Sequence, residues 1–185
     1  MLQHHKFLII QTAFLGDVIL ATSIVETIRK YHPDATIDFL LRKGNESLLT
    51  DHPYIREKLV FDKGKNKYRN LIRLIKKVRH QKYDMVINLQ RFVSSGLISV
   101  FSGGGAIIGF NKNPFSFLFT KKVRHIIDLK KPVHELERNH KLIEDFTGKL
   151  YEMPRLYPSE SDRKIVEDYQ NYICIAPASV WYTKQ

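Results

Sequence analysis

The chain has 185 residues, of which 43% are apolar and 26% are charged, and its formal charge at neutral pH is +11. This is the composition of a soluble globular protein, and the length allows one domain with a real core plus a remainder. The positive excess implies an anionic partner: a nucleic acid, a phosphorylated lipid or sugar, or an anionic membrane face. A single cysteine, Cys174, excludes an intrachain disulfide and agrees with a reducing compartment.

The stretch Lys6–Tyr31 predicts a strand, a tight loop and a helix. Residues 7–10 are an apolar run of strand type, residues 11–16 form the loop, and from Asp17 apolar side chains recur at helical spacing. The buried face of this helix should carry Leu20, Ile24, Ile28 and Tyr31. Asp17 falls at the N-cap or in the first turn, where its carboxylate faces the positive end of the helix dipole. Sheets of α/β type place binding chemistry outside the carboxyl ends of their strands.

Strands and helices alternate along most of the remaining chain. Strands are expected over 35–41, 57–61, 83–89 and 106–110, and helices over 46–50, 66–81, 92–101 and 134–147. In the second long helix, Leu71, Ile72, Ile75 and Val78 should face inward. The alternation predicts a parallel, doubly wound sheet.

The pattern changes near residue 155. Pro154 and Pro158 bracket a short linker, a polar helix is expected over 159–169, and a further strand over 172–176. A strand needs neighbours to pair with, so a second domain is expected to open there.

Asp17 is the first candidate for chemistry, either as a base or ligand contact or as a helix cap. The preceding Gly16 lets a ligand approach the backbone closely, or simply makes the turn. Neither of the glycine-rich nucleotide fingerprints is present. No grouping of His, Cys, Asp and Glu has the spacing of a metal site, and there is no nucleophile elbow.

A basic run extends from Lys63 to Lys82, where nine of twenty residues are Lys or Arg and none is Asp or Glu. Arg69, Arg73 and Lys76 share one face of the expected helix. The run indicates either a surface for anions or membranes or a plain solvated face. Nucleic-acid binding would be favoured by exposed aromatic residues between the cations. The aromatic residues nearby are Tyr68 and Tyr83, and the sequence leaves open that both are buried in the core.

Three later stretches carry weaker signals. Residues 90–95 follow the fourth strand and should lie on the same sheet edge as Asp17, where Arg91 holds a phosphate or is a surface arginine. His134 begins a helix and is either structural or catalytic. The loop after the last expected strand ends in Lys184, which suits a phosphate contact.

Together these stretches resemble the family 9 glycosyltransferases, the heptosyltransferases of bacterial lipopolysaccharide assembly. The resemblance rests on FLIIQTAFLGDVILATSIVETIRKYHPDATIDFL, NLQRFVSSGLIS, IIGF, HELERN and IAPASVWYTKQ, which occur in the order and approximate spacing of that family. It implies the N-terminal half of a GT-B glycosyltransferase, an α/β protein with a Rossmann-like parallel sheet flanked by helices. Residues 1–155 would then be the acceptor domain, and residues 156–185 a linker and the start of a nucleotide-sugar-binding domain.

The resemblance also implies an inverting transfer of sugar, without cofactor or metal, from a nucleotide-sugar of ADP-heptose type to a phosphorylated, lipid-linked saccharide. Asp17 matches the general base, and Thr183 and Lys184 match the donor-phosphate loop. The acceptor side would comprise Gln11, Thr12, Gly16, Gln90, Arg91, His134 and Arg138. The family context implies a cytoplasmic protein in peripheral contact with the anionic inner face of the inner membrane, and no nucleic-acid partner.

Two departures from the family pattern concern the acceptor. Gln11 stands where relatives often carry a basic residue, and Asn88 where an aspartate is common. These departures leave open a relative that uses a different sugar or glycan. Separate alternatives are a non-catalytic α/β domain that binds anions or nucleic acid through the Lys63–Lys82 surface, and a carbohydrate-binding remnant that lacks a donor domain.

Overall fold

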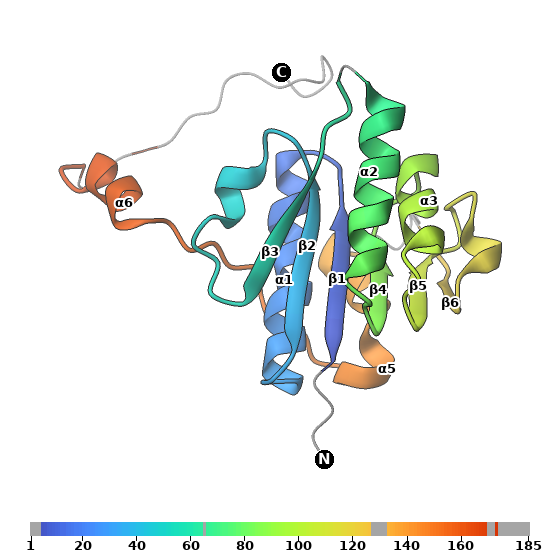
Figure 1. Cartoon of the computed structure of the whole chain (residues 1–185). Coiled ribbons are helices and arrows are strands. Elements are labelled where there is room, and N and C mark those ends of the chain that lie inside the picture. Colours follow the sequence, from blue (N-terminus) through green and yellow to red (C-terminus); the bar gives the residue numbers. More distant parts are fainter. Residues whose placement is uncertain (1–4, 65, 127–132, 170–172, 174–185) are drawn as a thin grey trace.

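A computed structural model describes residues 5–64, 66–126, 133–169 and 173 (Figure 1). Its centre is a six-stranded, wholly parallel sheet with the strand order β3-β2-β1-β4-β5-β6. The strands are β1 (Lys6–Gln11), β2 (Thr36–Arg42), β3 (Ile55–Phe61), β4 (Met85–Asn88), β5 (Ala106–Phe110) and β6 (Lys121–Val123). The strand order reverses between β1 and β4, which are neighbours in the sheet but not in the sequence.

Helices cover both faces of the sheet (Figure 1). They are α1 (Leu15–Tyr31), α2 (Lys67–His80), α3 (Val93–Phe101), α4 (Glu135–His140), α5 (Glu144–Thr147) and α6 (Glu160–Val166), with short 3₁₀ turns η1 (Glu46–Leu49) and η2 (Ser116–Leu118). One core lies between the sheet and α1 and α5, and a second lies between the sheet and α2 and α3. Helix α4 packs against α1.

The sequence of β1 explains its central position. Phe7 and Ile9 enter the core under α1, while Leu8 and Ile10 enter the core under α2 and α3. Successive side chains of a strand point to opposite faces, so a continuous apolar run suits a strand that is buried on both sides. The expected parallel α/β sheet flanked by helices is therefore confirmed.

Several expected details were wrong. Ile72 is 57% exposed rather than inward, and Leu74 takes the buried position instead. Tyr31 is exposed at the end of α1. The expected helix over 134–147 is two short helices, since Leu142 and Ile143 between them turn fully into the core. Strand β6 was not expected, because Lys-Lys-Val carries no strand pattern.

The segment after α5 is tied to α1 by hydroxyl groups. The backbone N–H of Glu152 donates to Thr27 Oγ1 at 2.9 Å, and that of Arg155 donates to Thr22 Oγ1 at 3.0 Å. These polar contacts explain why α1 buries hydroxyl side chains as well as apolar ones. Helix α6 follows this segment, begins at a capping box on Ser159 and is exposed throughout. Apart from residue 173, the strand expected over 172–176 lies outside the described residues.

A buried histidine under the same segment makes stability depend on pH. His52 Nε2 lies 3.4 Å from Glu26 Oε1, its ring packs edge-on against Tyr157, and burial lowers the pKa of His52 to about 4. The unfolded chain therefore takes up a proton between pH 6.5 and 4 that the folded chain refuses, so stability falls as pH falls through that window. Burial also raises the pKa of Glu26. This carboxyl group therefore lowers stability as pH rises above its ordinary pKa, which is opposite to the effect of His52.

We expect the free energy of unfolding to fall by about 1 kcal/mol per pH unit between pH 6 and 5 from His52 alone. Urea denaturation at several pH values measures the slope. The matched variant is His52→Leu, which keeps Glu26 and should flatten the slope in this range. Equal slopes in the two proteins would contradict the assignment.

Candidate active site

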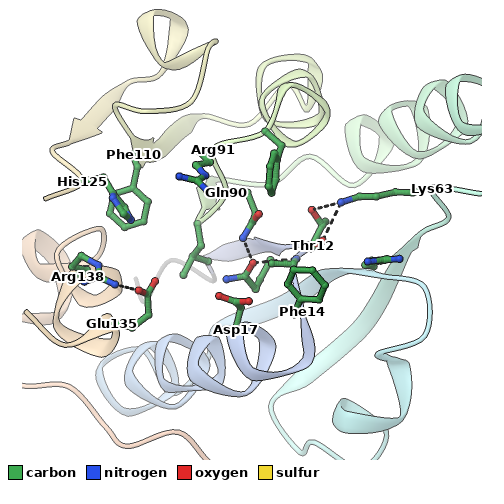
Figure 2. Close-up of a pocket in the computed structure, with 15 residues that line it drawn as sticks. Thr12, Phe14, Asp17, Lys63, Gln90, Arg91, Phe110, His125, Glu135 and Arg138 are labelled. Atoms are coloured by element: carbon green, nitrogen blue, oxygen red, sulfur yellow. Dashed lines mark hydrogen bonds and ion pairs between the residues drawn. The ribbon is translucent and has the colours of Figure 1, made fainter. Parts of the chain in front are cut away.

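A pocket of about 370 Å³ opens at the carboxyl ends of β1 and β4, where the strand order reverses (Figure 2). This is the position at which open α/β sheets bind ligands. The pocket is lined by Gln11, Thr12, Ala13, Phe14, Asp17, Arg42, Lys63, Leu89, Gln90, Arg91, Phe92, Phe110, His125, Glu135 and Arg138.

Asp17 lies in the first turn of α1, and its side chain borders the pocket (Figure 2). The N-cap position belongs to Phe14, so the prediction of a first-turn residue is confirmed and that of an N-cap is wrong. Asp17 forms no hydrogen bond or ion pair within the described part of the chain, so its carboxylate is available to a ligand. A Cβ at the neighbouring Gly16 would meet no atom within 4 Å, so packing does not require glycine there.

Two glutamines join the ends of β1 and β4 in the pocket. Gln90 Nε2 donates to Gln11 Oε1, and both side chains are buried. Gln11 Nε2 and Gln90 Oε1 have no hydrogen bond within the described residues, which leaves one donor and one acceptor for a ligand hydroxyl. The backbone is fixed in turn by Asn113, whose Nδ2 donates to the carbonyl of Gln90 at 2.9 Å.

Cations outnumber anions around the pocket. Lys63 Nζ donates to the carbonyl of Thr12 at 3.0 Å. Burial is the main cause that lowers the pKa of Lys63, and repulsion from Arg42 and Lys67 lowers it further. Arg138 is paired with Glu135, which neutralises both. Three cations, on Lys63, Arg42 and Arg91, are then left with the carboxylate of Asp17. Such a balance suits an anionic ligand.

His125 contributes a neutral imidazole to the pocket. Its ring lies edge-on to Phe110 with the centroids 4.8 Å apart, and its buried Nδ1 has no partner among the described residues. Burial, aided by Lys112, Arg138 and Arg91, lowers the pKa of His125, which favours the uncharged ring at neutral pH. An uncharged imidazole can exchange hydrogen bonds with a hydroxyl group.

The pocket brings together six of the residues singled out in the sequence: Asp17, Gln11, Thr12, Gln90, Arg91 and Arg138. His134 does not line it; its Nδ1 accepts the backbone N–H of Leu136 at 3.2 Å and caps α4. Thr183 and Lys184 lie outside the described residues.

The sequence reasoning missed several residues that line the pocket. Arg42 ends β2 and was not singled out, whereas Lys63, just after β3, was predicted only as the start of the basic run and not as a pocket residue. A charged residue at the carboxyl end of a strand is the signal that identifies both. Glu135 lies in the first turn of an expected helix, where the helix dipole already accounts for an acidic residue. His125 follows β6, which the sequence did not reveal, and therefore carried no usable signal.

Gly96 in α3 leaves room for Asn113, which binds the backbone of the pocket residue Gln90. A Cβ there would collide with Asn113 Oδ1 and lie 2.9 Å from Phe115 Cδ2. We expect Gly96→Ala to displace Asn113 and to lower the free energy of unfolding by about 2 kcal/mol. Amide hydrogen exchange should rise at 90–92, where Asn113 binds the backbone. Gly16→Ala, whose Cβ meets nothing, is the matched control; equal destabilisation of the two variants would contradict this packing argument.

Residues 71–185 match the family model of glycosyltransferase family 9 (heptosyltransferase). The chain belongs to this family. It is 36% identical over 80 residues to lipopolysaccharide heptosyltransferase 3 of Escherichia coli, an alignment that covers 41% of this chain and 24% of that protein.

Two solved structures share the fold of this family member. The family 9 glycosyltransferase of Veillonella parvula superposes with a TM-score of 0.77 at 22% identity, over 89% of this chain and 48% of that one. The E. coli ADP-heptose lipopolysaccharide heptosyltransferase II gives a TM-score of 0.69 at 21% identity, over 87% and 49%. The chain thus spans about half the length of these structures.

The described residues contain neither a candidate metal site nor a candidate membrane span. No three His, Cys, Asp or Glu side chains in that part of the chain are grouped so as to hold a metal ion. None of its helices combines the length and the apolar character needed to cross a membrane.

Proposed function

We propose that this chain is the acceptor-binding part of an inverting glycosyltransferase, which moves a sugar from an ADP-heptose-type donor to a phosphorylated lipopolysaccharide core acceptor. The observation that carries the proposal is the carboxylate of Asp17, which has no partner among the described residues and shares the pocket at the reversal of strand order with three cations. Membership of family 9 supports the class of reaction, and the name of the relative of known structure supports the donor.

In the proposed reaction, an acceptor hydroxyl attacks the anomeric carbon from the face opposite the diphosphate. The new carbon–oxygen bond forms as the bond to the phosphate oxygen breaks, so the configuration inverts and the electron pair leaves with the diphosphate. The hydroxyl proton passes to Asp17. Aspartate is a weak base in water, so placement within about 3 Å of the hydroxyl must supply much of the effect.

The remaining pocket residues would orient the acceptor. Lys63, Arg42 and Arg91 would bind its phosphate groups, since each presents charge to the pocket. The Gln11–Gln90 pair would bind sugar hydroxyls, and a basic residue at position 11 would favour phosphate instead. This difference suggests an acceptor that presents a hydroxyl where other members' acceptors present an anion.

The donor half of the proposal rests on the sequence. Residues 1–155 would form the acceptor domain, and residues 156–185 a linker and the start of the donor domain. Thr183 and Lys184 would contact the diphosphate and stabilise its charge as it leaves, without a metal ion. Because the acceptor is lipid-linked, the protein would work on the cytoplasmic side in peripheral contact with an anionic membrane face.

The test is a transfer assay with the polypeptide that carries this sequence together with a donor-binding half. It would receive ADP-heptose and a phosphorylated inner-core acceptor, and the anomeric configuration of the product would be determined. An inverted heptoside supports the proposal. Failure to glycosylate a panel of phosphorylated core acceptors, or retention of configuration, would contradict it.

A second candidate function is nucleic-acid binding through the Lys63–Lys82 surface, which the exposure of Tyr68 favours. It predicts affinity for RNA or DNA comparable to that for lipopolysaccharide fragments, with a steep loss of affinity as salt is added.

A further inference from the structure

The outer surface of α3 is largely apolar, which is unusual for a surface helix. Three of the four serines of the helix and its C-cap, at 95, 99 and 102, turn into the protein and are fully buried, while Ser94 is half-buried. Val93 and Phe101, which are about two turns apart on the opposite side, are 54% and 49% exposed. The helix carries no charged residue. An exposed apolar stripe on a surface helix typically marks an interaction site.

Helix α2 lies beside α3 on the same face of the sheet and adds both apolar and cationic side chains (Figure 1). Tyr68 and Ile72, one turn apart, are 77% and 57% exposed. Arg69, Arg73 and Lys76 are exposed as well, and none has a hydrogen bond or ion pair within the described residues. Neither helix contains an Asp or Glu.

The turn η2 extends this surface beyond α3. Phe117 and Leu118 are exposed there, and η2 is held to the start of α3 through Asn113, whose Nδ2 donates to the carbonyl of Phe92. The exposed apolar side chains of α2, α3 and η2, with the three cations of α2, are called the α2–α3 face below.

We propose that the α2–α3 face docks on an anionic phospholipid bilayer. Aromatic and aliphatic side chains enter the interfacial region of a bilayer, and cations beside them bind lipid phosphates. An apolar partner protein would leave the cations without counterparts, and a nucleic acid would leave Val93, Phe101 and Leu118 in water. The bilayer satisfies both sets of groups at once.

The position of the face agrees with this partner. Lys63 and Phe92 line the pocket, and they precede α2 and α3 respectively. Lys63 Nζ lies 5.7 Å from the centroid of the Phe92 ring, so the two helices begin together at the pocket rim. A bilayer against this face would bring lipid headgroups to the mouth of the pocket. The inference deepens the proposed function by naming its membrane contact, but docking itself needs neither donor nor acceptor.

The experiment is co-sedimentation of the 185-residue chain with vesicles of phosphatidylglycerol and phosphatidylethanolamine, and with phosphatidylcholine vesicles for comparison. Each cation near an anionic surface strengthens binding roughly fivefold, so Arg69→Gln/Arg73→Gln/Lys76→Gln should lose about a hundredfold in affinity. The matched control is Lys141→Gln/Lys149→Gln/Arg163→Gln, which removes the same charge from exposed positions at the C-cap of α4, after α5 and on α6. It should lose less than about fivefold.

A second variant tests the apolar contribution separately from charge. Ile72→Asn/Phe101→Asn alters two exposed side chains and should leave the unfolding midpoint unchanged, while vesicle affinity falls roughly tenfold even in high salt. Docking is overturned if the two charge variants lose affinity equally, or if vesicles do not bind. It is also overturned if RNA binds more tightly than the anionic vesicles, or if the apolar substitutions leave vesicle affinity in high salt unchanged. Vesicle binding involves no sugar transfer. A failure of the transfer assay described above would therefore not change what the vesicle experiment shows about docking.

Discussion

Replacing Asp17 by asparagine should reduce sugar transfer about a thousandfold while acceptor affinity changes less than about threefold, because general-base catalysis contributes two to four orders of magnitude. Asparagine keeps the size and polarity of the side chain but cannot take the hydroxyl proton. The expected signature is therefore a loss in kcat with little change in KM for the acceptor. The assay needs the polypeptide that carries both the acceptor and the donor halves.

Glu135→Gln is the control for this experiment. Glu135 is the other carboxylate of the pocket, but Arg138 neutralises it, whereas Asp17 has no such partner in the described residues. We expect Glu135→Gln to lower kcat by less than about tenfold, well below the range of a lost general base. Unchanged turnover in Asp17→Asn would remove Asp17 from the proposed role.

Replacing Asp38 by alanine should lower the free energy of unfolding by about 3 kcal/mol, since removing one partner of a buried charged network strands the others. Asp38 is fully buried in β2, accepts the hydroxyl of Tyr83 at 2.6 Å and is chelated by Arg56 through Nε and Nη2. Burial and the hydrogen bond to Asp38 raise the pKa of Tyr83, so its hydroxyl stays protonated and loses its acceptor.

Urea denaturation measures this loss, and Asp51→Ala, at an exposed turn, is the matched control. The network lies at the amino ends of the strands, opposite the pocket. The folded Asp38→Ala protein should therefore bind ligands in the pocket with unchanged affinity. A stability loss no larger than that of Asp51→Ala would show that Asp38 does not hold the sheet together.

The parallel sheet could be predicted because its strands are buried on both faces and read as continuous apolar runs, as in residues 7–10. Asp17, Gln90 and Arg91 could be assigned to one edge, because they follow neighbouring strands in a doubly wound sheet. The inward position of Ile72 was wrong, since helical spacing cannot tell an apolar residue that meets the core from one that meets a partner. Its exposure makes Ile72 part of the α2–α3 face.

Other features depended on contacts that are distant in sequence. Helical spacing alone could have predicted the ion pair of Glu135 with Arg138, which are three residues apart. Their position in the same pocket as Asp17 depends on the packing of α4 against α1. Strand β6 forms only because β5 offers it an edge, and His125 reaches the pocket only because β6 forms. The strand propensity of a segment does not contain information about such tertiary contacts.

The most direct test of the central claim is a pair of calorimetric titrations of this 185-residue chain, one with a phosphorylated lipopolysaccharide inner-core fragment and one with ADP and an ADP-sugar. We predict that the fragment binds and that the nucleotides do not, because the pocket presents acceptor-type groups and residues 156–185 represent only the start of the proposed donor domain. Tight nucleotide binding without fragment binding would reverse the assigned role of the domain and would contradict the assignment of Asp17 as the acceptor's base.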